Sequence, residues 1–417
     1  MIILIFSKLN INIHSEVLFH VSMQIGLIGK ANVGKSTFFN AATDLNVETG
    51  NYPFTTIKPN VGICYARQKC VCTEFGIKDN PTHSICLDGI RFIPIQIVDV
   101  AGLVPGAHMG KGLGNKFLDE ARQVDALIHV VDASGSTDRE GRSGAPGLFN
   151  PLDDIAFVEE EFDLWLLSVI KRDWSKSMDG NSNEQILVKR LSGLGIKHRV
   201  IDEVLTVINL KNKKLSLWNE EEILSFTKTL RQKSKPVVIA ANKSDISSSE
   251  HNLQAMMDRY ELVLPCTAEG EILLRNATNH GIIYYRPGDN SFKIKQTENL
   301  SERQQHALEL VAKFMKKYGS TGVQQIIDTV SFNILNKIVV YPVEDEVELK
   351  DKKGNVLPEV FLVDKGTTAR TLAAMVHKDL EEGFLFAIDA RTKKRVGADH
   401  ELQNNDVIKI VSTLSRG

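Results

Sequence analysis

Short apolar runs that end in polar, often glycine-containing loops recur along the first two thirds of the chain. They cover Gln24–Ile28, Phe92–Val98, Val130–Asp132, Pro236–Ala241 and the shorter Leu262–Leu264. Continuous apolar runs of this length are typical of strands buried on both faces of a sheet. Because a helix is expected directly after the first run, the pattern predicts an α/β fold with a doubly wound sheet.

After residue 151, apolar residues recur with helical spacing between the third and fourth of these predicted strands. Asn219 and Glu222 have the spacing of an N-terminal cap for a further helix. The sequence therefore predicts an inserted helical subdomain at 151–231, most simply an antiparallel hairpin or small bundle. The apolar positions that recur at three- and four-residue steps are Ile155, Val158, Phe162, Trp165, Leu166 and Val169, and then Val200, Ile201, Val204, Leu205 and Ile208.

The pattern changes again after residue 300. Ser301–Tyr318 has the apolar face of an amphipathic helix, and Val323–Leu335 is expected to form a second one. Short strands then accompany one helix at Thr371–Leu380, in the order strand, strand, helix, strand, strand. This order is typical of a β-grasp domain, which we expect at 338–417 after a helical connector at 301–337.

Composition sets limits on the kind of protein. The 417 residues include 50 Lys and Arg, 52 Asp and Glu, and 42% hydrophobic residues, which are ordinary values for a globular protein of two or three domains. The balanced charge means that any RNA contact must come from a local patch or from protein partners. Residues 1–22 begin with an apolar stretch that is too short to cross a membrane and has no cleavage site. Since Met23 heads the first predicted strand, Met23 is a candidate start of translation, and Met1 is the alternative.

The segment Gly29–Ser36 has the G-x-x-x-x-G-K-S spacing of a phosphate-binding loop. Its glycines let the backbone turn successive N–H groups toward phosphates, and the following helix adds the positive end of its dipole. Lys35 is expected to reach the β and γ oxygens of a nucleoside triphosphate, and the Ser36 hydroxyl to bind Mg²⁺. The nucleotide-binding residues expected here are Gly29, Asn32, Val33, Gly34, Lys35, Ser36 and Thr37.

The sequence Asp99-Val100-Ala101-Gly102 follows the Phe92–Val98 strand. A carboxylate at the end of a buried strand can hold Mg²⁺ through water, while the Gly102 N–H can face the γ-phosphate and register its loss. Between this motif and the phosphate loop, the polar stretch 51–60 suits a switch loop. Thr56 is expected there as a ligand of Mg²⁺ and the γ-phosphate, with Thr55 as the near alternative.

A base-recognition element is predicted at Asn242-Lys243-Ser244-Asp245, directly after a strand. The Asp245 carboxylate can accept two hydrogen bonds from guanine, and adenine has no matching pair of donors. Guanine is therefore the expected base. A weaker element follows at Thr267 and Ala268, where a backbone N–H can meet the base oxygen.

With these motifs in order, the chain resembles the Obg-related GTPases, and specifically the archaeal YchF-type branch. The resemblance rests on Asn51-Tyr-Pro-Phe-Thr-Thr, on Asp99-Val-Ala-Gly-Leu-Val-Pro-Gly-Ala-His108 and on Gly110-Lys-Gly-Leu-Gly-Asn-Lys-Phe-Leu118. It implies a P-loop GTP-binding domain at 23–150 and 232–300, and it likens the C-terminal portion to a TGS domain, a module of proteins that act on RNA and ribosomes.

The resemblance also implies a function: a slow GTP-hydrolysing switch that acts with Mg²⁺ on the ribosome or translation machinery. Many YchF-type members carry an altered base-recognition motif and favour ATP, whereas Asp245 here predicts GTP. The alternative is an ATP-preferring or barely hydrolysing adaptor for RNA or protein. We expect a cytoplasmic protein without membrane contact, and a monomer because no coiled-coil seam is present.

Two further residues are candidates for hydrolysis. Leu103 stands where many small GTPases have the glutamine that orients water. His108, on the glycine-bracketed segment Gly106–Gly114, is a candidate for positioning the water, with the Gly102 N–H facing the γ-phosphate. The alternative for His108 is a solvated loop histidine. In K⁺-activated relatives an asparagine at the place of Asn32 helps to bind the cation, so K⁺ is a possible cofactor, although Asn32 can also simply shape the loop.

Two clusters remain open. Cys70, Cys72, His83 and Cys86 can form a zinc site, but their C-x-C spacing departs from the usual zinc modules, so a plain loop is the alternative. Five cysteines in all fit a reducing compartment. The basic run 391–395 is either an RNA contact or a solvated hairpin turn.

Overall fold

The computed structural model describes residues 23–43, 60–100, 120–172, 183–295 and 300–414. Its centre is a seven-stranded sheet in the order β2-β4-β1-β5-β6-β7, with β3 added to β4. The strands are β1 (Gln24–Ile28), β2 (Val61–Lys69), β3 (Ile85–Leu87), β4 (Ile90–Asp99), β5 (Ala126–Asp132), β6 (Val237–Asn242) and β7 (Val263–Pro265). Neighbouring strands from β4 to β7 along this order are parallel, and β2 and β3 pair antiparallel with β4.

Helices cover both faces of this sheet. On one face α1 (Lys35–Thr43), α9 (Ala268–Asn279) and α11 (Val323–Asp328) share a core with the strands, in which Phe38 and Ile326 are fully buried. On the other face α4 (Pro151–Lys171) and α8 (Ser249–Arg259) pack against β5 and β6. The predicted doubly wound α/β sheet is confirmed.

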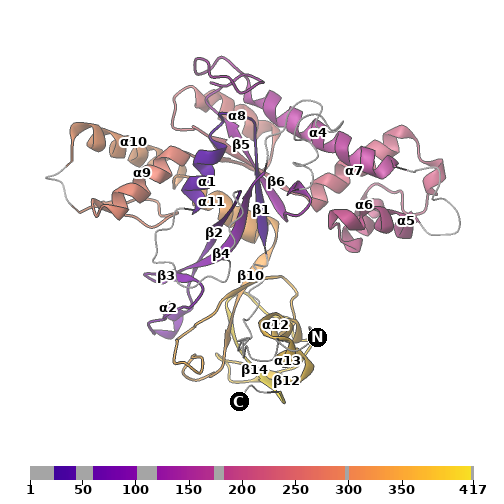
Figure 1. Cartoon of the computed structure of the whole chain (residues 1–417), viewed down its shortest axis with the longest axis vertical. Helices are drawn as coiled ribbons and strands as arrows, with labels where there is room; N and C mark the ends of the chain where they lie inside the picture. The colour runs from indigo at the N-terminus through magenta and orange to yellow at the C-terminus, as the bar shows by residue number, and fades with distance from the viewer. Residues whose placement is uncertain (1–22, 44–59, 101–119, 173–182, 296–299, 415–417) are drawn as a thin grey trace, which may run out of the picture.

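The helices α4, α5 (Asn183–Leu191), α6 (His198–Val207) and α7 (Glu220–Ser234) form a bundle with its own apolar core on one side of the sheet (Figure 1). The predicted cap of α7 is present as a reciprocal pair, in which each of Asn219 and Glu222 accepts the other's backbone N–H. The prediction missed α5, in which five of the nine residues are polar.

A second helical projection, built from α9 and α10 (Glu302–Tyr318), lies on the opposite side of the sheet in Figure 1. Ser301 caps α10 as predicted. Following α11, the chain continues as a short π-helix at Thr329–Ile334 and enters the C-terminal domain.

The C-terminal domain is a five-stranded sheet in the order β11-β10-β14-β12-β13, with α12 (Ala369–Val376) and α13 (Lys378–Glu382) beside it. Its strands are β10 (Lys337–Val343), β11 (Phe361–Asp364), β12 (Phe384–Asp389), β13 (Arg395–Val396) and β14 (Asp406–Ser412). The central pair β10 and β14 is parallel, and the others are antiparallel. This arrangement is the predicted β-grasp. Among the described residues, no helix is long and apolar enough to span a membrane.

Candidate functional site

The predicted phosphate-binding loop lies between β1 and α1, at the C-terminal edge of the parallel strands. Gly29 and Gly34 have φ values of 151° and 91°, where an L side chain is strained. A Cβ on Gly29 would also lie 2.6 Å from the Val130 carbonyl oxygen. The two glycines are therefore required by the backbone, and the loop delivers the chain to the N-terminus of α1, where anions are favoured.

Lys35 and Asp99 form an ion pair at this edge. They meet because β1 and β4 are parallel neighbours with Leu27 opposite Asp99, so that both strands end beside the loop. Ser36, in the first turn of α1, is exposed. A hydroxyl and a carboxylate are oxygen ligands of the type Mg²⁺ prefers, so the residues present fit the predicted metal. The other expected contributors, Thr56, Gly102 and His108, lie outside the described residues.

Asn242 ties two predicted nucleotide elements together. Its side-chain nitrogen donates to the Val33 carbonyl at 3.0 Å, and its side-chain oxygen accepts from the Ala268 N–H at 3.1 Å. The side chain is only 3% exposed. Thr267 caps α9 by accepting from the Gly270 N–H at 3.2 Å. Asn242, Thr267 and Ala268 thus hold the backbone around the expected base, and Asp245 stands exposed beside them.

Asp132 is a site residue that the sequence prediction assigned only as the end of a strand. Its carboxylate is 1% exposed and accepts hydrogen bonds from Ser134, Ser136 and Lys243, the last at 2.9 Å. Burial pushes the pKa of Asp132 up, but these hydrogen bonds outweigh it and hold the pKa below its ordinary value. Lys243 also donates to the Asn32 carbonyl at 3.0 Å, so the buried carboxylate positions a lysine that holds the phosphate loop.

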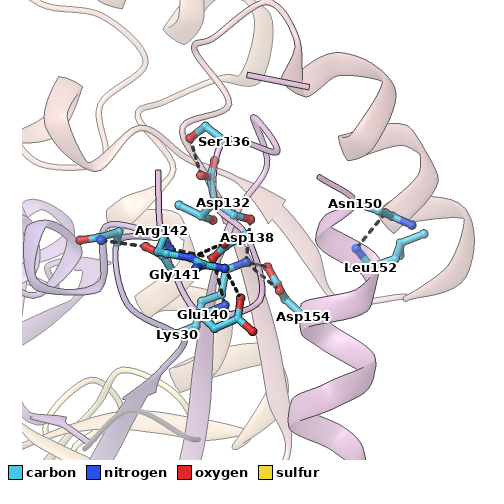
Figure 2. Close-up of polar contacts among 12 residues, drawn as sticks. Lys30, Asp132, Ser136, Asp138, Glu140, Gly141, Arg142, Asn150, Leu152 and Asp154 are labelled. Carbon is cyan, nitrogen blue, oxygen red and sulfur yellow. Dashed lines mark hydrogen bonds and ion pairs between the residues drawn. The ribbon is translucent and has the colours of Figure 1, made fainter. Parts of the chain in front are cut away.

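The segment 133–149, between β5 and α4, packs against the outside of the phosphate loop (Figure 2). Lys30 donates to the Thr137 carbonyl at 2.9 Å and pairs with Asp154 of α4 at 2.7 Å. The Asn32 side-chain nitrogen donates to the Gly141 carbonyl at 2.8 Å. Because this bond uses the nitrogen, K⁺ binding through Asn32 would depend on its amide oxygen, and K⁺ stays a prediction.

The cysteine-rich segment folds differently from the predicted ligand set. Cys70, Cys72 and Cys86 come together, but the fourth member of the group is Asp79 and not His83. The His83 ring instead bonds to Glu359 of the C-terminal domain at 2.7 Å.

The basic run 391–395 is partly used within the molecule. Arg391 makes a two-pronged ion pair with Glu74 of α2 (Cys72–Phe75), at 2.6 and 2.8 Å. Lys393 donates to the Glu346 carbonyl, and Arg395 stacks over Phe386 at 4.4 Å from the ring centre. Arg391 therefore joins the C-terminal domain to the central one, which leaves fewer charges of the run to contact RNA.

Three segments of the chain match known families. Residues 24–150 match the 50S ribosome-binding GTPase family, and residues 240–345 match the Obg-like GTPase YGR210-like, G4 motif-containing domain. Residues 346–412 match the TGS domain. These matches follow the order of the phosphate loop, the base-recognition element and the β-grasp domain along the chain.

Similar proteins extend over nearly the whole chain. An uncharacterized GTP-binding protein of Methanocaldococcus jannaschii is 48% identical over 394 residues, which are 93% of this chain and 98% of that protein. An uncharacterized GTP-binding protein of Schizosaccharomyces pombe is 36% identical over 84% of this chain and 89% of its own length. The ribosome-binding ATPase YchF of Bacillus subtilis is 28% identical over 88% of each chain.

Solved structures agree with the fold. The crystal structure of a GTP-binding protein from Pyrococcus horikoshii aligns with a TM-score of 0.73 at 38% identity, over 94% of this chain and all of that one. The YchF GTPase of Schizosaccharomyces pombe aligns with a TM-score of 0.56 at 19% identity, over 93% of this chain and 97% of that one. The latter likeness concerns the fold alone.

Proposed function

The chain belongs to the Obg-related GTPases of the YchF type, and on that basis we propose that it is a GTP-hydrolysing switch acting on the ribosome. The observation that carries the proposal is that two predicted nucleotide elements contact the phosphate loop at one edge of the sheet. Asp99 pairs with Lys35 of the loop, and Asn242 donates to the Val33 carbonyl. Lys35 is suited to the β and γ oxygens, and the loop amides are suited to the remaining phosphate charge.

Ser36 and Asp99 would hold Mg²⁺ together with Thr56. Bound Mg²⁺ would neutralise negative charge on the phosphates. Lys35 forms an ion pair with Asp99, so nucleotide binding would require the lysine to exchange this carboxylate for phosphate oxygens. Asp99→Asn should therefore weaken nucleotide binding more in the presence of Mg²⁺ than in its absence.

We propose GTP over ATP because Asp245 is exposed beside the Asn242 tie, where its carboxylate can accept from the guanine N1–H and amine. The relative from Methanocaldococcus jannaschii is named a GTP-binding protein, and the more distant Bacillus subtilis relative is named an ATPase. Affinities for GTP and ATP with Mg²⁺ present test the proposal. Tighter ATP binding by the unmodified chain would contradict it, and Asp245→Asn should reduce the preference for GTP.

Hydrolysis is proposed to use His108 to position water, in the absence of a glutamine after Gly102. His108→Ala should lower turnover and leave nucleotide affinity intact, and unchanged turnover would discard the role. Rates in K⁺ and Na⁺ buffers test whether Asn32 contributes to a cation site.

The ribosome is proposed as partner because the YchF relative carries that name and because the TGS domain is docked on the nucleotide-binding domain. A cytoplasmic monomer fits this role. Co-sedimentation with ribosomes in GDP, in a non-hydrolysable GTP analogue and without nucleotide should show attachment that differs between states. The alternative, a nucleotide-gated RNA or protein adaptor that barely hydrolyses, would show no phosphate release in a single-turnover assay with or without ribosomes.

A further inference from the structure

A compact group of sulfur and oxygen ligands lies where the central domain meets the TGS domain, well separated in sequence from the phosphate loop. The sulfur atoms of Cys70, Cys72 and Cys86 and a carboxylate oxygen of Asp79 all lie within 4.8 Å of one another. The sulfurs of Cys72 and Cys86 are 3.8 Å apart, and the Cys70 sulfur is 3.2 Å from Asp79. All three cysteines are free thiols.

These spacings are those of a tetrahedral metal site. Zinc–sulfur bonds of about 2.3 Å place two ligands of a tetrahedron about 3.8 Å apart. The Cys72–Cys86 separation has this value, the Cys70–Asp79 separation is 3.2 Å, and no pair of ligand atoms is more than 4.8 Å apart. Three thiolates with one carboxylate form a donor set that suits Zn²⁺ among the divalent ions.

The surroundings supply partners for metal-bound thiolates. Arg91 is completely buried, pairs with Asp79 at 2.9 Å, and donates to Ser84 at 2.8 Å and to the Leu357 carbonyl at 3.1 Å. Its Nε has no hydrogen-bond partner among the described residues. Three thiolates and a carboxylate carry more negative charge than Zn²⁺ cancels, and this guanidinium would offset part of the excess.

A second buried donor is unsatisfied at the same place. Tyr341, from β10 of the TGS domain, is 0% exposed, and its hydroxyl has no hydrogen-bond partner among the described residues. The Arg91 guanidinium, which pairs with Asp79, lies 5.4 Å from the centre of the Tyr341 ring. A buried hydroxyl without a partner is costly, and a Cys70 thiolate would offer it an acceptor.

From this geometry we infer that Cys70, Cys72, Asp79 and Cys86 form a structural Zn²⁺ site that fixes the segment 70–86 for docking of the TGS domain. The same segment makes the contacts between the domains. The Asn80 N–H donates to the Val356 carbonyl at 3.1 Å, and the Thr82 N–H donates to the Pro358 carbonyl at 2.8 Å. Zinc would hold the two ends of this segment together and so reduce the entropy cost of presenting these donors.

The test uses the full chain purified under reducing conditions. Metal analysis should find about one zinc per chain. After zinc is removed, Co²⁺ added to the protein should give the visible absorption of a tetrahedral thiolate complex. Zinc-free protein should also show faster hydrogen exchange at the amides of Asn80 and Thr82, with unchanged exchange in α10.

Matched variants make the assignment specific. Cys86→Ser should lose the zinc, whereas Cys64→Ala, at a buried cysteine of β2 outside the group, should keep it. His83→Ala should also keep the zinc, because its ring bonds to Glu359 and not to the group. If Cys86→Ser does not fold, the Co²⁺ spectrum of the unmodified chain decides alone.

Three results would overturn the inference. One is a protein that holds only trace zinc after exposure to Zn²⁺ and that does not give the cobalt absorption when Co²⁺ is added. Another is unchanged zinc content in a folded Cys86→Ser protein. The third is a chain that is lighter by two hydrogens after purification, since a Cys72–Cys86 disulfide would leave too few thiolates for the metal. None of these outcomes depends on whether the chain hydrolyses GTP.

Discussion

Replacing Asn242 with alanine is expected to loosen the structure around the nucleotide before any nucleotide is bound. The side chain donates to the Val33 carbonyl and accepts from the Ala268 N–H, at 3.0 and 3.1 Å, in a place where it is 3% exposed. Alanine removes both partners and leaves a buried carbonyl and a buried N–H, which water reaches poorly.

The magnitude follows from these two groups. Leaving a buried donor or acceptor without its partner costs about 1–3 kcal/mol, so losing both bonds should cost about 2–4 kcal/mol after partial relaxation. Since about 1.4 kcal/mol corresponds to a tenfold change, opening at the start of α9 should become more frequent by a factor on the order of 30 to several hundred. Asn242→Asp should lose only the bond to Val33, because a carboxylate still accepts from the Ala268 N–H but has no N–H to donate to the Val33 carbonyl.

Hydrogen exchange followed by mass spectrometry measures this directly. In Asn242→Ala, peptides containing Ala268 and peptides containing the start of α1 should both lose protection. In Asn242→Asp, only the α1 side should lose it. Asn279→Ala, at an exposed position at the end of α9, is the control and should change neither. Unchanged protection at Ala268 in the alanine variant would refute the reasoning, and Asn242 would then act only through contact with nucleotide.

Three further changes probe the same framework. Lys243→Met should destabilise the fold by about 3 kcal/mol at neutral pH, because it leaves the buried Asp132 carboxylate without its cationic partner. The pKa of Asp132 is lowered in the folded protein, so the difference in unfolding free energy should shrink as pH falls through that pKa. Urea denaturation measures this difference. Gly322→Ala should destabilise more than Gly354→Ala in the same assay: both have φ near 90°, but only at Gly322 would a Cβ meet a backbone carbonyl, at 2.1 Å. Burial raises the pKa of Asp328 to about 7, so the folded state binds the proton more tightly and stability should fall as pH rises from about 4 to 7; Asp328→Asn should flatten thermal melting temperatures across that range, and a slope equal to that of the unmodified chain would contradict the prediction.

Local pattern predicted most elements of this fold for a physical reason. The strands β1, β4 and β6 are buried runs that end in polar loops, and α7 and α10 begin at side chains that can cap them. Each of these signals is contained within a few residues, so no knowledge of the tertiary structure is needed to detect it. α5 lacked such a signal because its nine residues are mostly polar.

Contacts between distant residues had no such signal. In the sequence, Asp132 is only the end of a predicted strand; in the structure it pairs with Lys243, which directly follows β6. Glu74 likewise has no distinguishing feature in the sequence, but it pairs with Arg391 of the TGS domain. The pairing of Asp79 with three cysteines in place of His83 is of the same kind. Such pairs depend on how elements are placed in space, which the periodicity of a single chain does not record.

This has a consequence for how variants of the phosphate site should be interpreted. Asn242 and Lys243 were predicted as nucleotide contacts, yet each also donates to a backbone carbonyl of the phosphate loop. Loss of nucleotide binding in their variants therefore combines lost contacts with a loop that is no longer preorganised. Asp245 is exposed, so a change there should alter base preference with little effect on stability, and Asp245 is the residue whose variants report most directly on base recognition.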